Sequence, residues 1–279
     1  MTVREFITPA SPAEAVRALR AAAGRAAYLA GGTDLLCGRE WPEVVVNVRG
    51  LLDGLRLDGD DVVLGASATL GAIEDWPELD GRDGGLLGAC LREFGSRHVR
   101  NMATLGGNLA HAVPSADLAP PLLALGARCE IAGADGTRTV PLEKFFTGPR
   151  QTVLGGDLLT AVRFPAAPPG ARGAFMKVCH NPGAIAHVNV AVLLVLDGKT
   201  VSAARIALGA VAPTPLRARE AESHLEGQPA EAQHLRRAAE LAAAAAQPIS
   251  DQRASAEYRR HLCGVLTRRA LERCLKGDG

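Results

Sequence analysis

The sequence predicts an α+β protein built of two domains, and three observations lead to this. Residues 1–165 alternate short apolar runs that suit strands with amphipathic runs that suit helices. Residues 166–170 read A-A-P-P-G, a compact linker that cannot continue a helix or a sheet. Three strand-like runs and then three helix-like runs follow the linker, an order typical of α+β folds. We therefore expect domains at 1–165, with subdomains of about 1–55 and 56–165, and at 171–279.

The length of the chain agrees with two domains, and its composition argues against a nucleic-acid partner. The chain has 279 residues, which exceeds the usual length of a single domain. Its formal net charge is only +1 and aromatic residues make up 4%, whereas a nucleic-acid binder usually carries a basic surface with interleaved aromatics. We expect no nucleic-acid partner.

Targeting signals and cysteine spacing favour a cytoplasmic protein. The first ten residues include Arg4 and Glu5 and no apolar run, and the longest apolar run, 188–196, is too short to span a membrane. The six cysteines are scattered without a C-x-x-C pair, so we expect reduced thiols and no metal or iron–sulfur cluster held by this chain. Cys179, His180 and His187 are near in sequence but lack the regular spacing of a metal site.

The first predicted helix covers residues 12–23. Ser11 has the position of an N-cap, Pro12 that of the first helical residue, and Glu14 that of the capping-box partner. Gly24 should end the helix. A short buried strand at 26–30 then runs directly into a glycine pair.

The rest of the first domain continues with strands at 44–48 and 62–64 and an amphipathic helix at 84–94. Residues 96–113 show no clean periodicity and predict an irregular binding loop. Ser115 should cap a helix that runs to about residue 125.

The last elements follow the same rules. A hairpin at 128–132 and 137–140 and a strand at 158–164, closed by Pro165, should complete the first domain. The second domain should contain strands at 175–178, 189–196 and 201–210 and helices at 214–225, 230–246 and 255–275.

The first segment that points to function reads Y-L-A-G-G-T-D-L at residues 28–35. A turn without side chains lets consecutive backbone N–H groups approach the two negative charges of a dinucleotide diphosphate. Thr33 adds a hydroxyl, whereas Asp34 is better suited to ordering the loop. The segment does not match G-x-G-x-x-G, which excludes a Rossmann fingerprint, and alone it is no more than a strand exit.

The second segment reads V-R-N-M-A-T-L-G-G-N-L-A-H at residues 99–111 and continues to Pro114 and Asp117. Another glycine pair lies beside hydroxyl and amide groups, shortly before a predicted helix start whose partial positive charge favours an anion. Two such segments could enclose one cofactor.

Together, A-G-G-T-D-L and V-R-N-M-A-T-L-G-G-N with a following P-x-x-D resemble the FAD-binding signature of the medium subunits of the xanthine dehydrogenase and carbon monoxide dehydrogenase family. The resemblance covers nearly the whole chain. It implies a two-subdomain FAD-binding domain of the vanillyl-alcohol oxidase/PCMH type, followed by a smaller C-terminal domain of a three-stranded antiparallel sheet and a three-helix bundle.

The resemblance also implies the FAD-binding residues. Phe94 matches an aromatic residue near the flavin, Leu159 an apolar contact, and Lys177 a lysine of the flavin neighbourhood. We expect His111 to be a polar loop residue that contacts backbone or cofactor phosphate. The full set of expected FAD-binding residues is Tyr28, Leu29, Ala30, Gly31, Gly32, Thr33, Asp34, Leu35, Phe94, Ala103, Thr104, Gly106, Gly107, Asn108, His111, Asp117, Leu159 and Lys177.

The family to which the sequence is similar is a group of molybdenum hydroxylases whose cofactors are carried by separate subunits. The resemblance implies a large partner subunit with molybdopterin, a small partner subunit with [2Fe-2S] clusters, and a dimer of heterotrimers, that is, a heterohexamer. FAD on this chain would collect electrons from the small subunit and pass them to an acceptor such as NAD. Because the protein's share of such chemistry is to bind and orient the flavin, no catalytic acid or base is expected here.

Three positions depart from the family pattern. His98 stands where glutamine is common, His111 where a smaller or amide residue is common, and residues 181–183, N-P-G, replace a more charged loop near the flavin. This last difference leaves the electron acceptor open between NAD, quinone and oxygen.

Two other functions compete with this interpretation. A free-standing FAD oxidoreductase of the same superfamily would need a substrate domain after residue 170, a region that looks short and unspecialised. A flavin-free assembly or scaffold protein would not need both glycine pairs.

Overall fold

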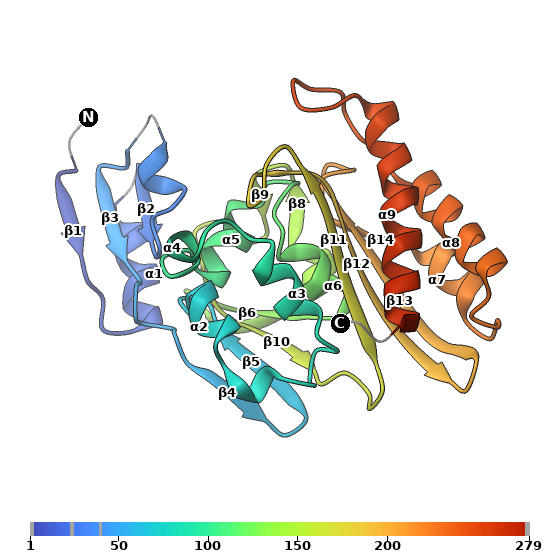
Figure 1. Ribbon diagram of the computed structural model, residues 1–279. Helices are drawn as coiled ribbons and strands as arrows, with labels where there is room; N and C mark the ends of the chain where they lie inside the picture. Colours follow the sequence, from blue (N-terminus) through green and yellow to red (C-terminus); the bar gives the residue numbers. More distant parts are fainter. Residues whose placement is uncertain (1–2, 23–24, 39–40, 277–279) are drawn as a thin grey trace.

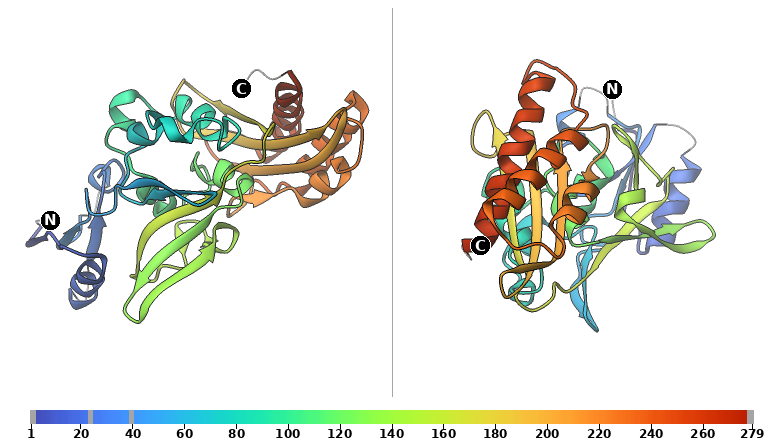
Figure 2. Two further views of the ribbon diagram at one scale, coloured as in Figure 1. Left: turned by 90° about the horizontal axis from the view of Figure 1, so that it is seen from below. Right: turned by 90° about the vertical axis from the view of Figure 1, so that its right-hand side faces the viewer.

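The computed structural model describes residues 3–22, 25–38 and 41–276, and its strands form a small N-terminal sheet, a larger central sheet, a C-terminal sheet and a two-stranded ribbon (Figure 1). A small N-terminal sheet lies at one end of the molecule and a group of three helices at the other, as two views agree (Figure 2). A larger central sheet and its helices lie between them. Within the described residues, no helix is long and apolar enough to cross a membrane.

The N-terminal sheet is parallel, in the order β1-β3-β2, and consists of β1 (Glu5–Ile7), β2 (Ala26–Leu29) and β3 (Val44–Asn47). Helix α1 (Pro12–Ala21) packs on it, with Ala15 and Val16 buried. The predicted Ser11 cap is confirmed, because its hydroxyl accepts from the Glu14 N–H at 3.2 Å. The Glu14 carboxylate reaches the N–H of Ala10 rather than that of Ser11. Gly24 lies outside the described residues.

The central sheet is antiparallel, with strand order β4-β5-β10-β6-β7. The predicted hairpin is confirmed as the pair β6 and β7, and the two-stranded ribbon β8–β9 follows it. The bounds are β4 (Leu55–Asp58), β5 (Asp61–Gly65), β6 (Arg128–Gly133), β7 (Gly136–Pro141), β8 (Phe146–Gly148), β9 (Gln151–Thr152) and β10 (Leu158–Pro165).

Short helices lie between the strands of the N-terminal and central sheets. Their bounds are η1 (Leu35–Cys37), α2 (Leu70–Glu74), η2 (Pro77–Leu79), α3 (Leu86–Arg92), α4 (Arg97–Arg100), α5 (Leu105–His111), α6 (Ala119–Ala124) and η3 (Leu142–Lys144).

Two of these helices correct the sequence prediction for residues 96–113. The segment is not irregular, because Ser96 caps α4 and Thr104 caps α5 through their hydroxyls. The glycine pair in the first turn of α5 has low intrinsic helix propensity and hides this helix from periodicity. Helix α6 was also placed too early: Leu118 is its N-cap, not Ser115. Pro120 and Pro121 fit only the first turn of a helix, so the helix starts just before them.

The C-terminal sheet is antiparallel and has four strands where three were expected: β11 (Arg172–Cys179), β12 (Ala186–Asp197), β13 (Thr200–Gly209) and β14 (Leu216–Arg217). The short β14 pairs with β13, so helix α7 (Arg219–Leu225) starts later than the predicted residue 214. Helices α8 (Ala232–Ala245) and α9 (Ala256–Lys276) complete the cover of the sheet (Figure 1).

The main hydrophobic core crosses the linker at residues 166–170. Helices α3 and α6 lie between the central sheet and the inner face of the C-terminal sheet. Phe175, Leu193 and Ala207 of that face belong to the same buried cluster as the central sheet. The other face forms a second core with α7, α8 and α9. The division into domains at 1–165 and 171–279 stays a prediction.

Candidate functional site

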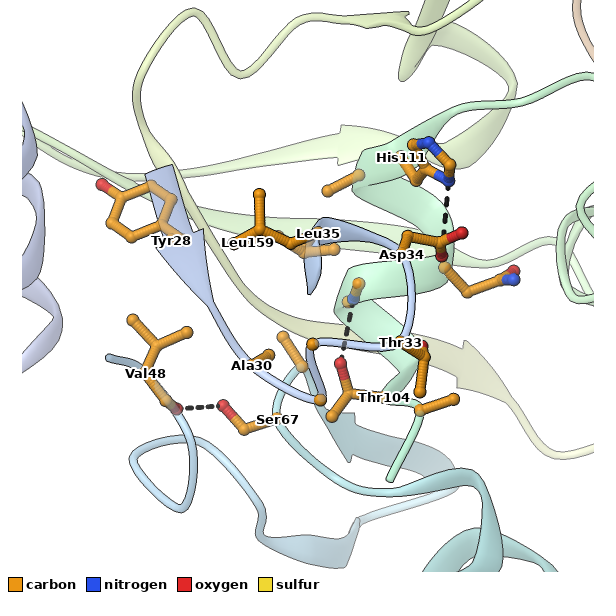
Figure 3. A pocket seen from close by; sticks show the side chains of 18 of the residues that line it. Tyr28, Ala30, Thr33, Asp34, Leu35, Val48, Ser67, Thr104, His111 and Leu159 are labelled. Carbon is orange, nitrogen blue, oxygen red and sulfur yellow. Dashed lines mark hydrogen bonds and ion pairs between the residues drawn. The ribbon is translucent and has the colours of Figure 1, made fainter. Parts of the chain in front are cut away.

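A cavity of about 470 Å³ opens where the N-terminal sheet meets the central sheet, a volume in the range of small-molecule sites. Its walls come from the end of β2, the turn that follows it, helix α5, and the start of β10. Figure 3 shows side chains from both glycine segments around this cavity, among them Thr33, Thr104 and His111. The fold therefore brings together two segments that lie about seventy residues apart in the chain.

The two segments touch each other directly. A β-carbon on Gly31 would overlap the carbonyl oxygen of Met102, which lies just before the second glycine pair. Glycine at position 31 is thus required for the close approach of two backbones, independently of any ligand.

The first glycine turn offers free donors. Gly32 has φ +73°, the left-handed region that favours glycine. Within the described part of the chain, the backbone N–H groups of Gly31, Gly32, Thr33 and Asp34 have no hydrogen-bond partner in the protein. Successive unbonded N–H groups in a turn form a concave anion site, so this segment can bind a phosphate.

The second glycine pair is different, because its backbone donors are already used. The N–H of Gly106 donates to Ala66 O at 2.8 Å, and that of Gly107 to the Thr104 hydroxyl at 3.1 Å. A β-carbon on Gly106 would lie 2.7 Å from the oxygen of Ala66. Gly106 therefore allows helix α5 to pack against the chain after β5. Gly107 is exposed in the cavity wall, where it places no side chain.

One polar atom beside this helix lacks a partner. The side-chain oxygen of Asn108, which lines the cavity, is buried and forms no hydrogen bond within the described residues. Since buried polar atoms nearly always have partners, Asn108 is suited to a ligand donor such as a hydroxyl. The neighbouring Ser67 hydroxyl is already used, because it donates to Val48 O at 2.6 Å (Figure 3).

Asp34, His111 and Arg150 form a chain of polar contacts along the cavity. His111 Nδ1 lies 3.4 Å from Asp34 Oδ2, and Arg150 Nη1 lies 2.5 Å from His111 Nε2. The hydrogen bond from His111 lowers the pKa of Asp34, against the opposing effect of partial burial. Asp34 is therefore ionised at neutral pH. Its side chain contacts His111 of α5, and its expected role in ordering the loop stays a prediction.

The opposite end of the cavity holds a second set of charges. Asp157 accepts hydrogen bonds from Arg138 and, at 2.6 Å, from Arg20. Burial alone would raise the pKa of Asp157, but these two arginines outweigh it and lower the pKa. Tyr28 donates to Gly156 O, and burial together with the charge of Asp157 raises its pKa to about 12.

Most of the expected FAD-binding residues line this cavity. The exceptions are Leu29, Asp117 and Lys177. Lys177 Nζ of β11 lies 2.5 Å from a carboxylate oxygen of Asp117, and Asn189 donates to the other oxygen at 2.8 Å. All three are buried, and burial raises the pKa of Asp117 although the ammonium opposes it. In this arrangement the pair joins the C-terminal sheet to the loop before α6.

Sequence reasoning missed several residues of the cavity wall. Arg150 follows a Gly-Pro turn and Asp157 a glycine pair, so local turn signals were present, but nothing local shows which wall they reach. The missed residues are Gly38, Val48, Leu52, Ala66, Ser67, Ala110, Arg150, Leu154, Asp157 and Leu158.

Metal ligation has no geometric basis in the described part of the chain. No group of three His, Cys, Asp or Glu side chains there is arranged to hold a metal ion. Cys179 donates to Asn181 O, and the six cysteines are unpaired.

The residues present fit a dinucleotide with a diphosphate centre, because N–H groups that are free among the described residues, an unpartnered amide oxygen and apolar walls surround one cavity. Fold and site together define an α+β protein with a cavity suited to such a cofactor. Two family models match nearly the whole chain: the FAD binding domain in molybdopterin dehydrogenase over residues 2–167, and the CO dehydrogenase flavoprotein C-terminal domain over residues 173–274. The chain belongs to the family of FAD-binding medium subunits of carbon monoxide and xanthine dehydrogenases.

Individual relatives are similar to this chain over nearly their whole length. The chain is 36% identical over 281 residues to the carbon monoxide dehydrogenase medium chain of Afipia carboxidovorans, covering 96% of each protein. It is 32% identical to the xanthine dehydrogenase FAD-binding subunit of Escherichia coli O157:H7, covering 91% of this chain and 90% of the other.

A solved structure of carbon monoxide dehydrogenase from Hydrogenophaga pseudoflava, which lacks the Mo-pyranopterin moiety of its cofactor, superposes with a TM-score of 0.95 at 33% identity. The superposition covers 99% of this chain and 98% of that chain. The expected family and fold class are confirmed. The protein is an FAD-binding subunit of an oxidoreductase of the molybdenum hydroxylase type.

Proposed function

We propose that this chain takes electrons from [2Fe-2S] clusters of a small partner subunit and passes them through bound FAD to an external acceptor such as NAD. The observation that carries the proposal is the cavity in which one glycine turn presents four N–H groups, unbonded within the residues that the structure describes, beside the capped start of α5. FAD supplies the redox chemistry, because a flavin exchanges electrons singly or in pairs. The chain supplies binding, orientation and electrostatic tuning.

Individual residues have separate tasks in this proposal. The turn at Gly31 and Gly32 holds the diphosphate, Asn108 accepts from the cofactor, and Phe94 with Leu159 covers its apolar part. Asp117 and Lys177 act at the flavin end, where the buried pair fixes β11 against the loop before α6. Leu29 holds the turn in place, because its side chain packs next to Gly32.

The substrate is oxidised on another chain in this proposal, at the molybdopterin of a large subunit, within a dimer of heterotrimers. The relatives support this, because medium chains named for different substrates, carbon monoxide and xanthine, are both similar to this chain over nearly their full length. We also propose a cytoplasmic location, supported by six unpaired cysteines.

Co-expression of the chain with its neighbouring subunits tests the proposal. We expect flavin absorption and extractable FAD from the chain alone, and additional iron and molybdenum in the complex. Reduction of the complex by its substrate, followed by addition of NAD, quinone or oxygen in separate experiments, identifies the acceptor.

Two results would contradict the proposal. A colourless chain that does not take up FAD added in excess would indicate a scaffold protein. Substrate turnover by the isolated flavin-loaded chain would indicate a free-standing oxidoreductase.

A further inference from the structure

The charged side chains that line the cofactor cavity differ in whether they form direct ion pairs. Its two carboxylates have basic partners, because Asp157 is paired with Arg20 and Arg138, and Asp34 contacts His111. Among the described residues that line the cavity, Arg150 is the single arginine or lysine. Within the same part of the chain no carboxylate forms an ion pair with it. Arg150 thus brings to the cavity a positive charge that acts on the Asp34 carboxylate across His111 and is not held in a direct ion pair.

The backbone that carries Arg150 is fixed. Arg150 has φ +59°, a left-handed conformation that is uncommon for a residue with a side chain, in the tight turn between β8 and β9. Its N–H donates at 2.8 Å to the oxygen of Ala112, the left-handed C-cap of α5. The turn is therefore attached to the end of the helix that forms the cavity wall.

The side chain is held as well. The guanidinium donates to Nε2 of His111, so the proton of a neutral His111 lies on Nδ1 and points to Asp34. Such a ring accepts from a cation on one side and donates to an anion on the other. Asp34 carries the last of the four N–H groups of the first glycine turn that are unbonded among the described residues, so the two contacts link Arg150 to the proposed diphosphate site.

We propose that Arg150 is the cation that offsets the charge of the cofactor diphosphate, and that His111 and Asp34 position it. This inference rests on the proposed binding of FAD. A diphosphate carries two negative charges, which partial charges of N–H groups reduce but do not cancel. A guanidinium matches phosphate oxygens with two parallel donors, whereas an ammonium acts as a point charge.

Equilibrium binding of FAD to the flavin-free full chain, followed by flavin fluorescence, tests the role. We expect Arg150→Ala to weaken FAD about tenfold, the lower end for a charge-assisted hydrogen bond because the guanidinium is solvent-exposed. Arg150→Lys should lose less, since it keeps the charge. Arg237→Ala, which removes an exposed arginine of α8, is the matched control and should leave the affinity unchanged.

Competition by ADP and by adenosine shows which half of FAD Arg150 contacts. Arg150→Ala should weaken ADP by the same factor as FAD and leave adenosine unaffected, and added salt should weaken FAD less in this variant than in the wild type. His111→Ala should reproduce part of the loss, and His111→Gln should restore it, because an amide can again accept from Arg150.

The two possible failures are distinguishable. If the wild-type chain binds no FAD, the proposed function fails. The assignment of Arg150 to the diphosphate is wrong if the wild type binds FAD and Arg150→Ala binds both FAD and ADP as tightly as the wild type does. It is also wrong if Arg150→Ala loses affinity for FAD but not for ADP. In both cases the proposed function stands.

Discussion

The two glycine pairs look alike in sequence and act differently in the structure. Gly31 and Gly32 end a strand and leave four N–H groups unbonded among the described residues, whereas Gly106 and Gly107 begin a helix whose first N–H groups are used. The turn at Gly32 leaves backbone donors open to a ligand, whereas Gly31 and Gly106 each let two segments of the chain approach closely. A pair of adjacent glycines therefore indicates that another group comes close to the backbone. The hydrogen bonds of the surrounding backbone show whether that group can be a ligand or is another segment of the chain.

The most damaging substitution should be Gly31→Ala, because the new β-carbon would overlap the carbonyl of Met102. We expect a loss of about 3 kcal/mol in the free energy of unfolding, the upper part of the usual range for overpacking, and loss of FAD. Urea denaturation and extracted flavin measure the two effects. Gly54→Ala, where a β-carbon meets no atom within 4 Å, is the control. Equal stability of the two variants would show that the segments do not touch.

Gly107→Leu should separate binding from folding. Gly107 is exposed in the cavity wall, and a β-carbon there would lie 2.9 Å from the Thr104 hydroxyl, so we expect the added side chain to shift this hydroxyl and to extend into the space expected for the cofactor. We expect FAD affinity to fall roughly tenfold or more, the equivalent of at least 1.4 kcal/mol, with an unchanged far-ultraviolet circular dichroism spectrum. Wild-type FAD content in this variant would mean that α5 does not border the cofactor.

Thr104→Ala should show a smaller effect on stability. The hydroxyl of Thr104 caps α5 by accepting from Gly107, and loss of such a cap costs about 1 kcal/mol. Thr104→Ser keeps the hydroxyl and should restore most of this stability in urea denaturation. If the serine variant is as unstable as the alanine variant, the methyl group rather than the cap is the cause.

The smallest effect concerns the other end of the cavity. The chain has two tyrosines, so Tyr258→Phe leaves Tyr28 as the single phenol. Its absorbance titration should give a pKa of about 12, raised by burial and by Asp157. A raised pKa means that the stability from protonated Tyr28 is complete below pH 10, the unfolded value, and is lost as the pH rises toward 12. A midpoint near 10 would contradict the buried position.

Sequence reasoning found the elements whose periodicity is long and regular, such as the β6–β7 hairpin and the helices α8 and α9. It missed β1, β4 and β14, which have two to four residues and contain no fully buried residue. Strands this short and exposed hold too few residues for an alternation of apolar and polar residues to predict them. It also missed α4 and α5, where hydroxyl caps compensate for weak helix propensity.

The candidate site divides in the same way. The residues of the two glycine segments are consecutive, so a motif identifies them together. Arg150 and Asp157 reach the cavity only because the β8–β9 ribbon lies against α5 and the start of β10 lies against α1. Asp117 and Lys177 were expected at the cofactor from family resemblance, and the structure places them together as a buried ion pair outside the cavity wall.

The core that crosses residues 166–170 constrains how such a chain can change. Phe175 and Leu193 pack with α3 and α6, so the surface that the C-terminal sheet shows to the rest of the chain is apolar and shaped to these helices. A hybrid that joined the first 165 residues to the corresponding tail of a relative would inherit mismatched side chains at this contact. Substitutions on α3 and α6 should therefore be accompanied, across relatives, by compensating substitutions on β11 and β12.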